Sequence, residues 1–332
     1  LCTSMERLLI TLILVCTMSN ITNAQNPFYG QYHTPHEAVP FDRIETEHYE
    51  PAILEGIKLQ NAEIEAIIQN PEKADFTNTI EAFEESGKLL DKVVAVFGNM
   101  LSAETNDDLQ ELAQKIMPLL SEHSNNITLN EKLFARVKEV YNQKETLQLT
   151  QEQKQLLENA YNSFIRHGAN LEGEAREEYR RLTTELSKLT LTFSENNLKE
   201  TNAYQMLLTK KESLAGLPEI IIEAAAETAK NEEKEGWAFT LHAPSYIPFM
   251  TYSDNRDLRQ KLYMAYNTKC THDNEFNNID IVKKIANTRM KIAQLLGYKD
   301  YAEYTLKKRM AENSKSVYKL LNQLLEAYTP TA

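Results

Sequence analysis

The sequence has 332 residues, of which 42% are hydrophobic and 25% are charged, so it is long enough for one large domain or two ordinary ones. Its formal net charge is −12 at pH 7, and no cluster of lysine and arginine interleaves with aromatic residues. This composition excludes a disordered chain and argues against binding to nucleic acid or to an anionic membrane surface.

Residues 1–24 have the pattern of a secretory signal peptide, with Met5 as the start of translation. An apolar core covers 8–18, and the small residues Thr22 and Ala24 precede a cleavage site. The apolar run is too short to span a membrane as a helix. We therefore expect an exported protein, periplasmic or secreted, with no membrane segment once the signal is removed.

The chain has three cysteines, which limit the disulfides and cysteine-based metal sites it can form. Cys2 and Cys16 fall in the signal segment, which leaves Cys270 alone and predicts a mature protein without a disulfide or a cysteine-based metal site. A lipoprotein attached through Cys16 is the alternative to a soluble product, although the bulky Val15 stands where a small residue is needed. Cys270 is expected to be a semi-buried thiol, and a cysteine hydrolase that pairs it with His272 is the less favoured interpretation.

An extended N-terminal arm is expected over 25–45, and it contains a fragment of a metal-binding motif. His36 and Glu37 match the first half of HExxH, in which two histidines four residues apart on one helical face bind zinc and the glutamate is the general base. Pro40 occupies the position of the second histidine, and another proline directly precedes His36. Because proline removes a backbone donor and clashes with the preceding turn, we expect no metal-binding helix here.

The fold class expected for 46–332 is mainly α, a large multi-helix domain. The first helix carries an isoleucine stripe from Ile53 to Ile68, and the next begins near Thr77, which is expected to be its N-cap. A regular apolar seam is expected to pack a long helix against its neighbours; it comprises Tyr179, Leu182, Leu186, Leu189 and Phe193. Further helices are expected at 107–123, 129–143, 254–268, 275–296, 300–311 and 314–328.

A small strand–helix–strand insertion is expected near 203–252. Aromatic and apolar residues in AYQMLLT and GWAFTLHAP are typical of strands. The segment between them begins with Pro218 near a helix N-terminus and ends at Gly236.

Several phrases, in order, resemble the thimet oligopeptidase family of zinc metallopeptidases, and within it the bacterial peptidyl-dipeptidase (dipeptidyl carboxypeptidase) branch. The opening NPFYGQYHTPHEAVPFDRIETEHYEPAI is similar to the arm of that branch, and DFTNTIEAFEESGKLLDKVVAVFGNM is similar to its second helix. The resemblance covers essentially all of 26–332. The phrases that continue it are FIRHGANL, LSKLTLTFSENNL, LAGLP, APSYIPFMTYSDNRDLRQKLYMAYN and ANTRMKIAQLLGYKDYAEYTLKKRMA.

The resemblance implies a helical enzyme built as two halves around a deep channel that admits short peptides, acting as a monomer. In the family, an HExxH helix and a glutamate on a following helix hold zinc in the C-terminal half, and the branch releases dipeptides from free C-termini. The apolar run from Val317 to Leu325 needs a surface to cover it, and the family continues with more helices. We therefore expect 46–332 to be the N-terminal region of such a peptidase, truncated before its zinc domain.

No residue of this chain is assigned as catalytic, cofactor-binding or metal-ligating. His48 and Tyr49 lie in a family phrase but are expected to pack or cap. A non-catalytic helical module that binds peptides without cutting them is the alternative function. No two histidines are four apart, and the complete set is His33, His36, His48, His123, His167, His242 and His272.

Overall fold

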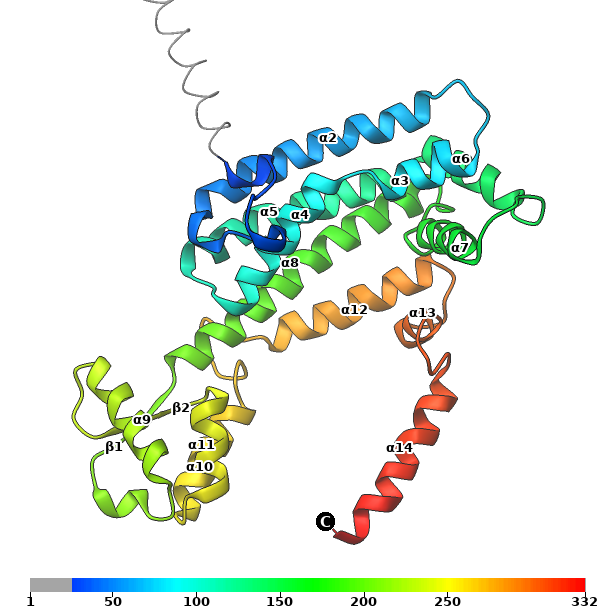
Figure 1. Cartoon of the computed structure of the whole chain (residues 1–332). Helices are drawn as coiled ribbons and strands as arrows, with labels where there is room; N and C mark the ends of the chain where they lie inside the picture. Colours follow the sequence, from blue (N-terminus) through cyan, green and yellow to red (C-terminus); the bar gives the residue numbers. More distant parts are fainter. Residues whose placement is uncertain (1–25, 332) are drawn as a thin grey trace, which may run out of the picture. The chain divides into compact units, whose positions relative to one another are not determined.

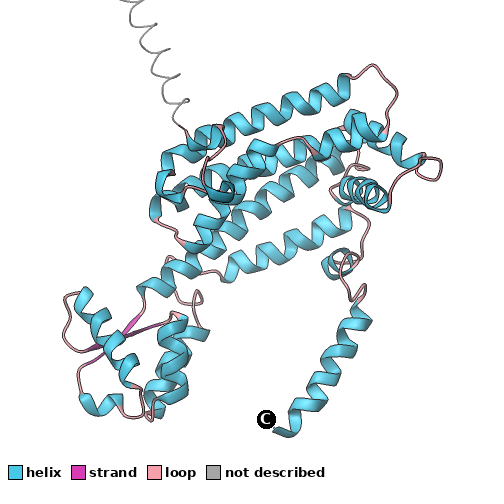
Figure 2. Cartoon of the chain, in the orientation of Figure 1, coloured by secondary structure: helices cyan, strands magenta, loops and turns pink. Residues whose placement is uncertain are grey.

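The computed structural model describes residues 26–331, so the signal-peptide prediction lies outside the described residues. The chain is mainly helical, as expected, and its strands form one small sheet (Figures 1 and 2). It divides into two compact units. Unit 1 contains the chain up to Thr184 together with Gln294–Lys299, and unit 2 contains Glu185–Ala293 together with the chain from Asp300 onward.

Unit 1 is built from helices joined by short connections. Most of α8, which begins in this unit, continues beyond Thr184 into unit 2. The helices of unit 1 are α2 (Tyr49–Gln69), α3 (Ala82–Glu84), α4 (Lys88–Ala103), α5 (Asp107–Thr128), α6 (Glu131–Asn142), α7 (Gln151–Arg166) and the start of α8 (Gly173–Ala203).

Helices α2 and α4 of unit 1 approach each other closely, and a glycine makes this possible. A Cβ placed on Gly56 of α2 would lie 2.9 Å from the Cα of Leu90 in α4. No larger side chain fits there without moving one of the two backbones, so Gly56 sets the separation of this pair.

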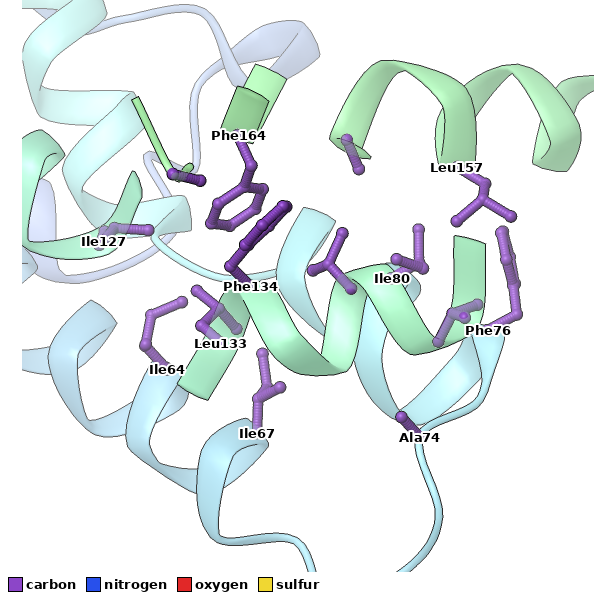
Figure 3. Close-up of a cluster of buried hydrophobic side chains, with 14 residues drawn as sticks. Ile64, Ile67, Ala74, Phe76, Ile80, Ile127, Leu133, Phe134, Leu157 and Phe164 are labelled. Atoms are coloured by element: carbon purple, nitrogen blue, oxygen red, sulfur yellow. The ribbon is translucent and has the colours of Figure 1, made fainter. Parts of the chain in front are cut away.

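The main core of unit 1 is a cluster from α2, α6, α7 and the turn before α3 (Figure 3). At its centre Phe164 is 1% exposed, with its ring centroid 5.4 Å from Phe83 and 5.8 Å from Phe134. Ile80 and Leu133 are fully buried in the same cluster. Apolar residues on one face of each helix therefore meet in one core, as their spacing predicts.

The start of the segment before α3 corrects one prediction. Thr77 is not the N-cap; Asp75 is, and its side chain accepts a hydrogen bond from the Asn78 amide at 2.7 Å. The Asn78 side chain accepts one from the Asp75 amide at 3.0 Å, which completes a reciprocal box. The turn after this cap, Phe76–Glu81, is π-helical and buries Phe76 and Ile80. The ordered segment therefore begins two residues earlier than a helix capped by Thr77 would.

Unit 2 holds the remainder of α8, the strand–helix–strand insertion and the later helices. The insertion is confirmed: β1 (Gln205–Leu208) pairs antiparallel with β2 (Trp237–Thr240), and α9 (Glu219–Asn231) connects them with Pro218 as its N-cap. A core that includes Met206, Phe239, Phe249 and Leu262 joins the sheet to its helices. The later helices are α10 (Ala243–Tyr252), α11 (Arg256–Asn267), α12 (Ile279–Leu295), α13 (Tyr301–Leu306) and α14 (Ser314–Tyr328).

The apolar seam of α8 is buried only in part, which corrects the expectation of continuous packing. Tyr179 and Leu182 are 3% and 1% exposed, Leu186 and Leu189 are half-buried, and Phe193 is 37% exposed. Two later helices are also shorter than expected. The helix expected at 275–296 begins at Ile279, because the amides of Asn278 and Ile279 bond within the preceding loop or its side chains. The one expected at 300–311 ends at Leu306.

Candidate functional site

The partial metal motif in the arm does not form a helical site. Pro35–Glu37 is a single 3₁₀ turn, and His36 adopts a left-handed conformation with φ 59° and ψ 23°. Glu37 is also left-handed, and its carboxylate accepts a hydrogen bond from the Tyr32 amide at 3.0 Å. Residues 35–40 therefore do not form the continuous helix that an HExxH site requires. The arm is not simply extended, because short 3₁₀ turns recur along it.

His48 and Tyr49 have the capping and packing roles expected for them. His48 Nδ1 accepts a hydrogen bond from the Glu45 amide at 2.9 Å, which closes the turn before α2. Tyr49 is 3% exposed. Its ring centroid lies 5.4 Å from that of Phe28 in the arm and 5.2 Å from that of Phe97 in α4. Tyr49 therefore joins the arm to α4, and His48 closes the turn that leads into α2.

A groove of about 520 Å³ lies beside this anchor, between the 3₁₀ turn Pro27–Tyr29 and helices α2 and α4. Its lining includes apolar side chains of all three elements together with Lys92. The Lys92 ammonium donates to the Gly30 carbonyl at 2.9 Å and lies 4.3 Å above the Tyr32 ring. Lys92 therefore holds the arm in place, and burial lowers the pKa of its ammonium.

A cluster of Cys, His, Glu and Asn side chains lies in unit 2, where α8 meets the loop between α11 and α12. The backbone N–H of Cys270 donates to the Glu200 carboxylate of α8, and the Asn274 side-chain amide donates to Glu200 Oε1 at 3.4 Å. His272 Nε2 lies 3.8 Å from the same Oε1 atom. We call this set of Glu200, Cys270, His272 and Asn274 the Glu200 junction.

Cys270 is held in the Glu200 junction as a protonated thiol. Its side chain is 5% exposed, and its backbone has a left-handed φ of 59°. Burial is the larger cause that raises the pKa of the thiol, and the hydrogen bond of the Cys270 side chain to the Glu200 carboxylate is the next. Together they raise this pKa to about 11. A nucleophilic cysteine needs the opposite shift, toward the thiolate. The Glu200 junction is therefore a structural clamp. Cys270 is more deeply buried than the semi-buried thiol expected from the sequence, and its lack of activation stays a prediction.

The zinc implied by the family resemblance does not fit the Glu200 junction. A zinc-binding cysteine must lose its proton, whereas this thiol is held protonated. The Glu200 carboxylate is occupied by the Cys270 and Asn274 donors. Within residues 26–331, no group of three or more His, Cys, Asp and Glu side chains is arranged to hold a metal ion. Sequence reasoning singled out Cys270 and His272 but missed Glu200, which lies 70 residues earlier.

Exposed aromatic side chains on α10 and α11 form a second surface of interest in unit 2. The rings of Tyr246 and Tyr266 stack with centroids 4.2 Å apart, and Tyr252 and Tyr263 are 52% and 49% exposed. Flat rings with a terminal hydroxyl offer apolar contact and hydrogen bonding together.

Comparison with known proteins relates this mainly helical chain to the peptidase M3 class. Residues 249–332 match the model of Peptidase family M3. The chain is 34% identical to the dipeptidyl carboxypeptidase of Escherichia coli (strain K12), over 91% of this chain and 44% of that protein. It is 30% identical to oligopeptidase A of Salmonella typhimurium, over 92% of this chain and 45% of that protein. It is also 25% identical to a thimet-like oligopeptidase of Dictyostelium discoideum, over 86% of this chain and 42% of that protein.

These matches confirm the resemblance to the thimet oligopeptidase family predicted from the sequence. The chain spans less than half the length of each of these relatives. What the relatives' names describe is therefore the activity of proteins more than twice as long as the matched region.

Proposed function

We propose that this chain is the N-terminal, channel-forming portion of an exported zinc metallopeptidase that hydrolyses short peptides and releases C-terminal dipeptides. The observation that carries the proposal is the match along 91% of this chain to 44% of a dipeptidyl carboxypeptidase. In this role the helices supply one wall of the channel and the scaffold for the catalytic half, while zinc supplies Lewis-acid and water-activating chemistry from outside this chain. The parent enzyme acts as a monomer on oligopeptides.

Export is the second part of the proposal, and it rests on the signal-peptide pattern of residues 1–24. Within residues 26–331, no helix has the length and hydropathy needed to cross a membrane. Cell fractionation of a host that expresses the chain from Met5, followed by N-terminal sequencing, tests the expected cleavage before Gln25.

The purified 332-residue chain is expected to be inactive on its own. With internally quenched peptides of about six to ten residues, zinc should give no hydrolysis above the blank, because the histidines of this chain provide no HExxH pair. Sequencing the gene beyond codon 332 is the companion test, and an open frame that encodes HExxH is the expected result. Chelator-sensitive hydrolysis by the purified chain would contradict the proposal.

A non-catalytic peptide-binding module is the second candidate, and the exposed tyrosines of α10 and α11 favour it. The two functions differ in the sequence that the gene encodes after residue 332. A stop codon at position 333, together with peptide binding without cleavage, would select the binding module.

Helix α14 supports a larger parent protein through its exposed apolar face. Leu320, Leu321 and Leu325 are 57%, 50% and 66% exposed, and Tyr328 is 64% exposed. No residue of this helix is buried in the structure of residues 26–331. Apolar side chains gathered on one exposed helix face mark an interaction surface or an aggregation risk.

The purified chain is therefore expected to bind an apolar dye and to self-associate through α14. Replacing Leu321 and Leu325 together by glutamate should reduce both dye fluorescence and the associated fraction in sedimentation velocity by more than half. Lys319→Glu, which changes charge on the same helix without removing apolar surface, is the control and should have little effect. A compact wild-type monomer without dye binding would refute the expectation.

A further inference from the structure

Strand β1 has a definite outer edge, which is established by the register and one side-chain bond. Gln205 pairs with Thr240, and Leu207 pairs with Ala238. The Thr240 amide donates to Ser245 Oγ at 3.0 Å, so it is not available to Gln205. In an antiparallel ladder, hydrogen-bonded and non-hydrogen-bonded pairs alternate. The Gln205 and Leu207 pairs are therefore the non-hydrogen-bonded ones, and their own peptide groups point away from β2.

A second observation fixes the same alternation independently. A Cβ on Gly236, which directly precedes β2, would lie 2.3 Å from the Leu208 carbonyl oxygen. The Leu208 carbonyl thus points toward β2, as a member of a hydrogen-bonded pair must. Its neighbour Leu207 presents its N–H and C=O to the opposite side.

The outer edge of β1 is not paired with another strand within residues 26–331. Among the described elements only β2 pairs with β1, and the Leu207 N–H and C=O have no hydrogen-bond partner among residues 26–331. The Leu207 side chain is 40% exposed, whereas Met206 and Leu208 are 2% and 8% exposed and belong to the core of unit 2. Met206 and Leu208 therefore anchor the strand in the core, while Leu207 faces solvent and Gln205 is half-buried.

We propose that the outer edge of β1 binds an extended peptide segment as a third strand of the sheet. A row of outward N–H and C=O groups is complementary to another extended backbone, and an edge strand offers it without regard to most of the peptide's sequence. The exposed Lys210 and Lys211 follow the strand after Thr209, in a chain whose net charge is −12. They favour a peptide with an acidic residue at that end. The inference rests on the proposed function and names where the peptide is held.

A proline substitution tests the edge without breaking the existing sheet. Leu207→Pro removes one outward N–H, and because this N–H is not used by β2, the β1–β2 ladder keeps its bonds. Leu207→Thr is the matched control, since it also removes the leucine side chain but keeps the N–H and a β-favouring residue. Far-UV circular dichroism verifies that both variants fold as the wild type does.

The probe is an acetylated, fluorescein-labelled hexapeptide of alternating valine and threonine with a terminal glutamate, and binding is read by fluorescence anisotropy on the full chain. Leu207→Pro should weaken binding roughly 3- to 10-fold relative to Leu207→Thr, the effect of one backbone hydrogen bond. The same peptide with every backbone nitrogen methylated should not bind measurably. This second comparison needs no variant, so it holds even if Leu207→Pro fails to fold.

Three outcomes would overturn the inference. Equal binding by the proline and threonine variants, or undiminished binding of the methylated peptide, would place the peptide elsewhere and leave the proposed peptidase function intact. Loss of self-association instead of peptide binding in Leu207→Pro would assign the edge to a second copy of this chain. Failure of the proposed function itself is read separately, from the sequence beyond codon 332 and the hydrolysis assay.

Discussion

Truncating Phe164 to alanine is expected to lower the free energy of unfolding by about 3–5 kcal/mol. The ring is 1% exposed, and its centroid lies 5.4 Å from that of Phe83 and 5.8 Å from that of Phe134. Removing it takes away buried apolar surface and leaves a cavity that three separate segments border. Because a domain is stable by only about 5–15 kcal/mol, this single change should remove a large share of the stability of unit 1.

Urea denaturation followed by far-UV circular dichroism measures this loss, and the chain supplies its own control. Phe41 lies in the same unit and is 51% exposed, so Phe41→Ala should cost less than about 1 kcal/mol. Similar shifts of the transition for the two variants would show that the cluster around Phe164 is not the core of unit 1. A shift confined to Phe164→Ala supports it.

Local patterns in the sequence were sufficient to place most helices, but not to define how each one begins. The segment after Ala74 reads as a helix start, and Thr77 is an acceptable N-cap residue. Asp75 is the cap instead, because Asn78 completes a reciprocal pair of bonds with it. The signal was present as an Asp and an Asn three residues apart. It is weaker than the Ser/Thr–Glu pattern usually sought at a helix start.

Periodicity identifies the apolar face of a helix but not what covers it. The 3–4 spacing along α8 predicted both a helix and a packed seam. The helix is present over its full length, but burial decreases from Leu182, at 1% exposed, to Phe193, at 37%. The same limitation applies to α14, whose apolar face was recognised in the sequence and lies exposed in the structure. A partner surface is a property of residues far away in the sequence, or of another chain.

The Glu200 junction could not be predicted from local sequence patterns, because it too joins residues that are far apart in the sequence. Glu200 is one of many glutamates on helix faces, and nothing around it in the sequence distinguishes it. Its partners Cys270 and Asn274 come 70 and 74 residues later, in a loop whose shape depends on further bonds from Asn278. The sequence indicated a thiol without an activating partner. Burial and the negative charge of the nearby Glu200 carboxylate, which both disfavour the thiolate, are consistent with that interpretation.

The raised pKa of Cys270 leads to a large expected effect on its reactivity. At pH 8, a thiol of pKa about 11 is ionised about 100-fold less than one with the ordinary value of 9.0. Iodoacetamide should therefore alkylate Cys270 about 100-fold more slowly in the folded chain than in the urea-unfolded chain. Peptide mapping by mass spectrometry separates this site from Cys2 and Cys16. Faster alkylation in the folded chain would instead indicate an activated cysteine.

Variants of Glu200 separate the contributions of burial and of the Glu200 carboxylate to the slow alkylation of Cys270. Glu200→Gln removes the charge and should speed alkylation several-fold, but burial, the larger cause, should keep the rate below that of the unfolded chain. Glu200→Ala also removes the acceptor of the buried Cys270 N–H, and should cost about 1–3 kcal/mol of stability. Glu275→Gln, an exposed change in the same loop, is the control and should alter neither quantity.

The raised pKa of Cys270 also determines how the stability of the folded chain changes with pH in alkaline solution. Folding raises the pKa of the Cys270 thiol from 9.0 to about 11, so the folded state retains a proton that the unfolded chain releases. The stabilisation from this group is complete below about pH 9 and is lost as the pH rises through about 11. Cys270→Ser cannot ionise in this range and keeps a donor for Glu200. Its unfolding midpoint should therefore fall less than that of the wild type between about pH 8.5 and pH 11, and an equal fall in both proteins would show that the thiol does not titrate as proposed.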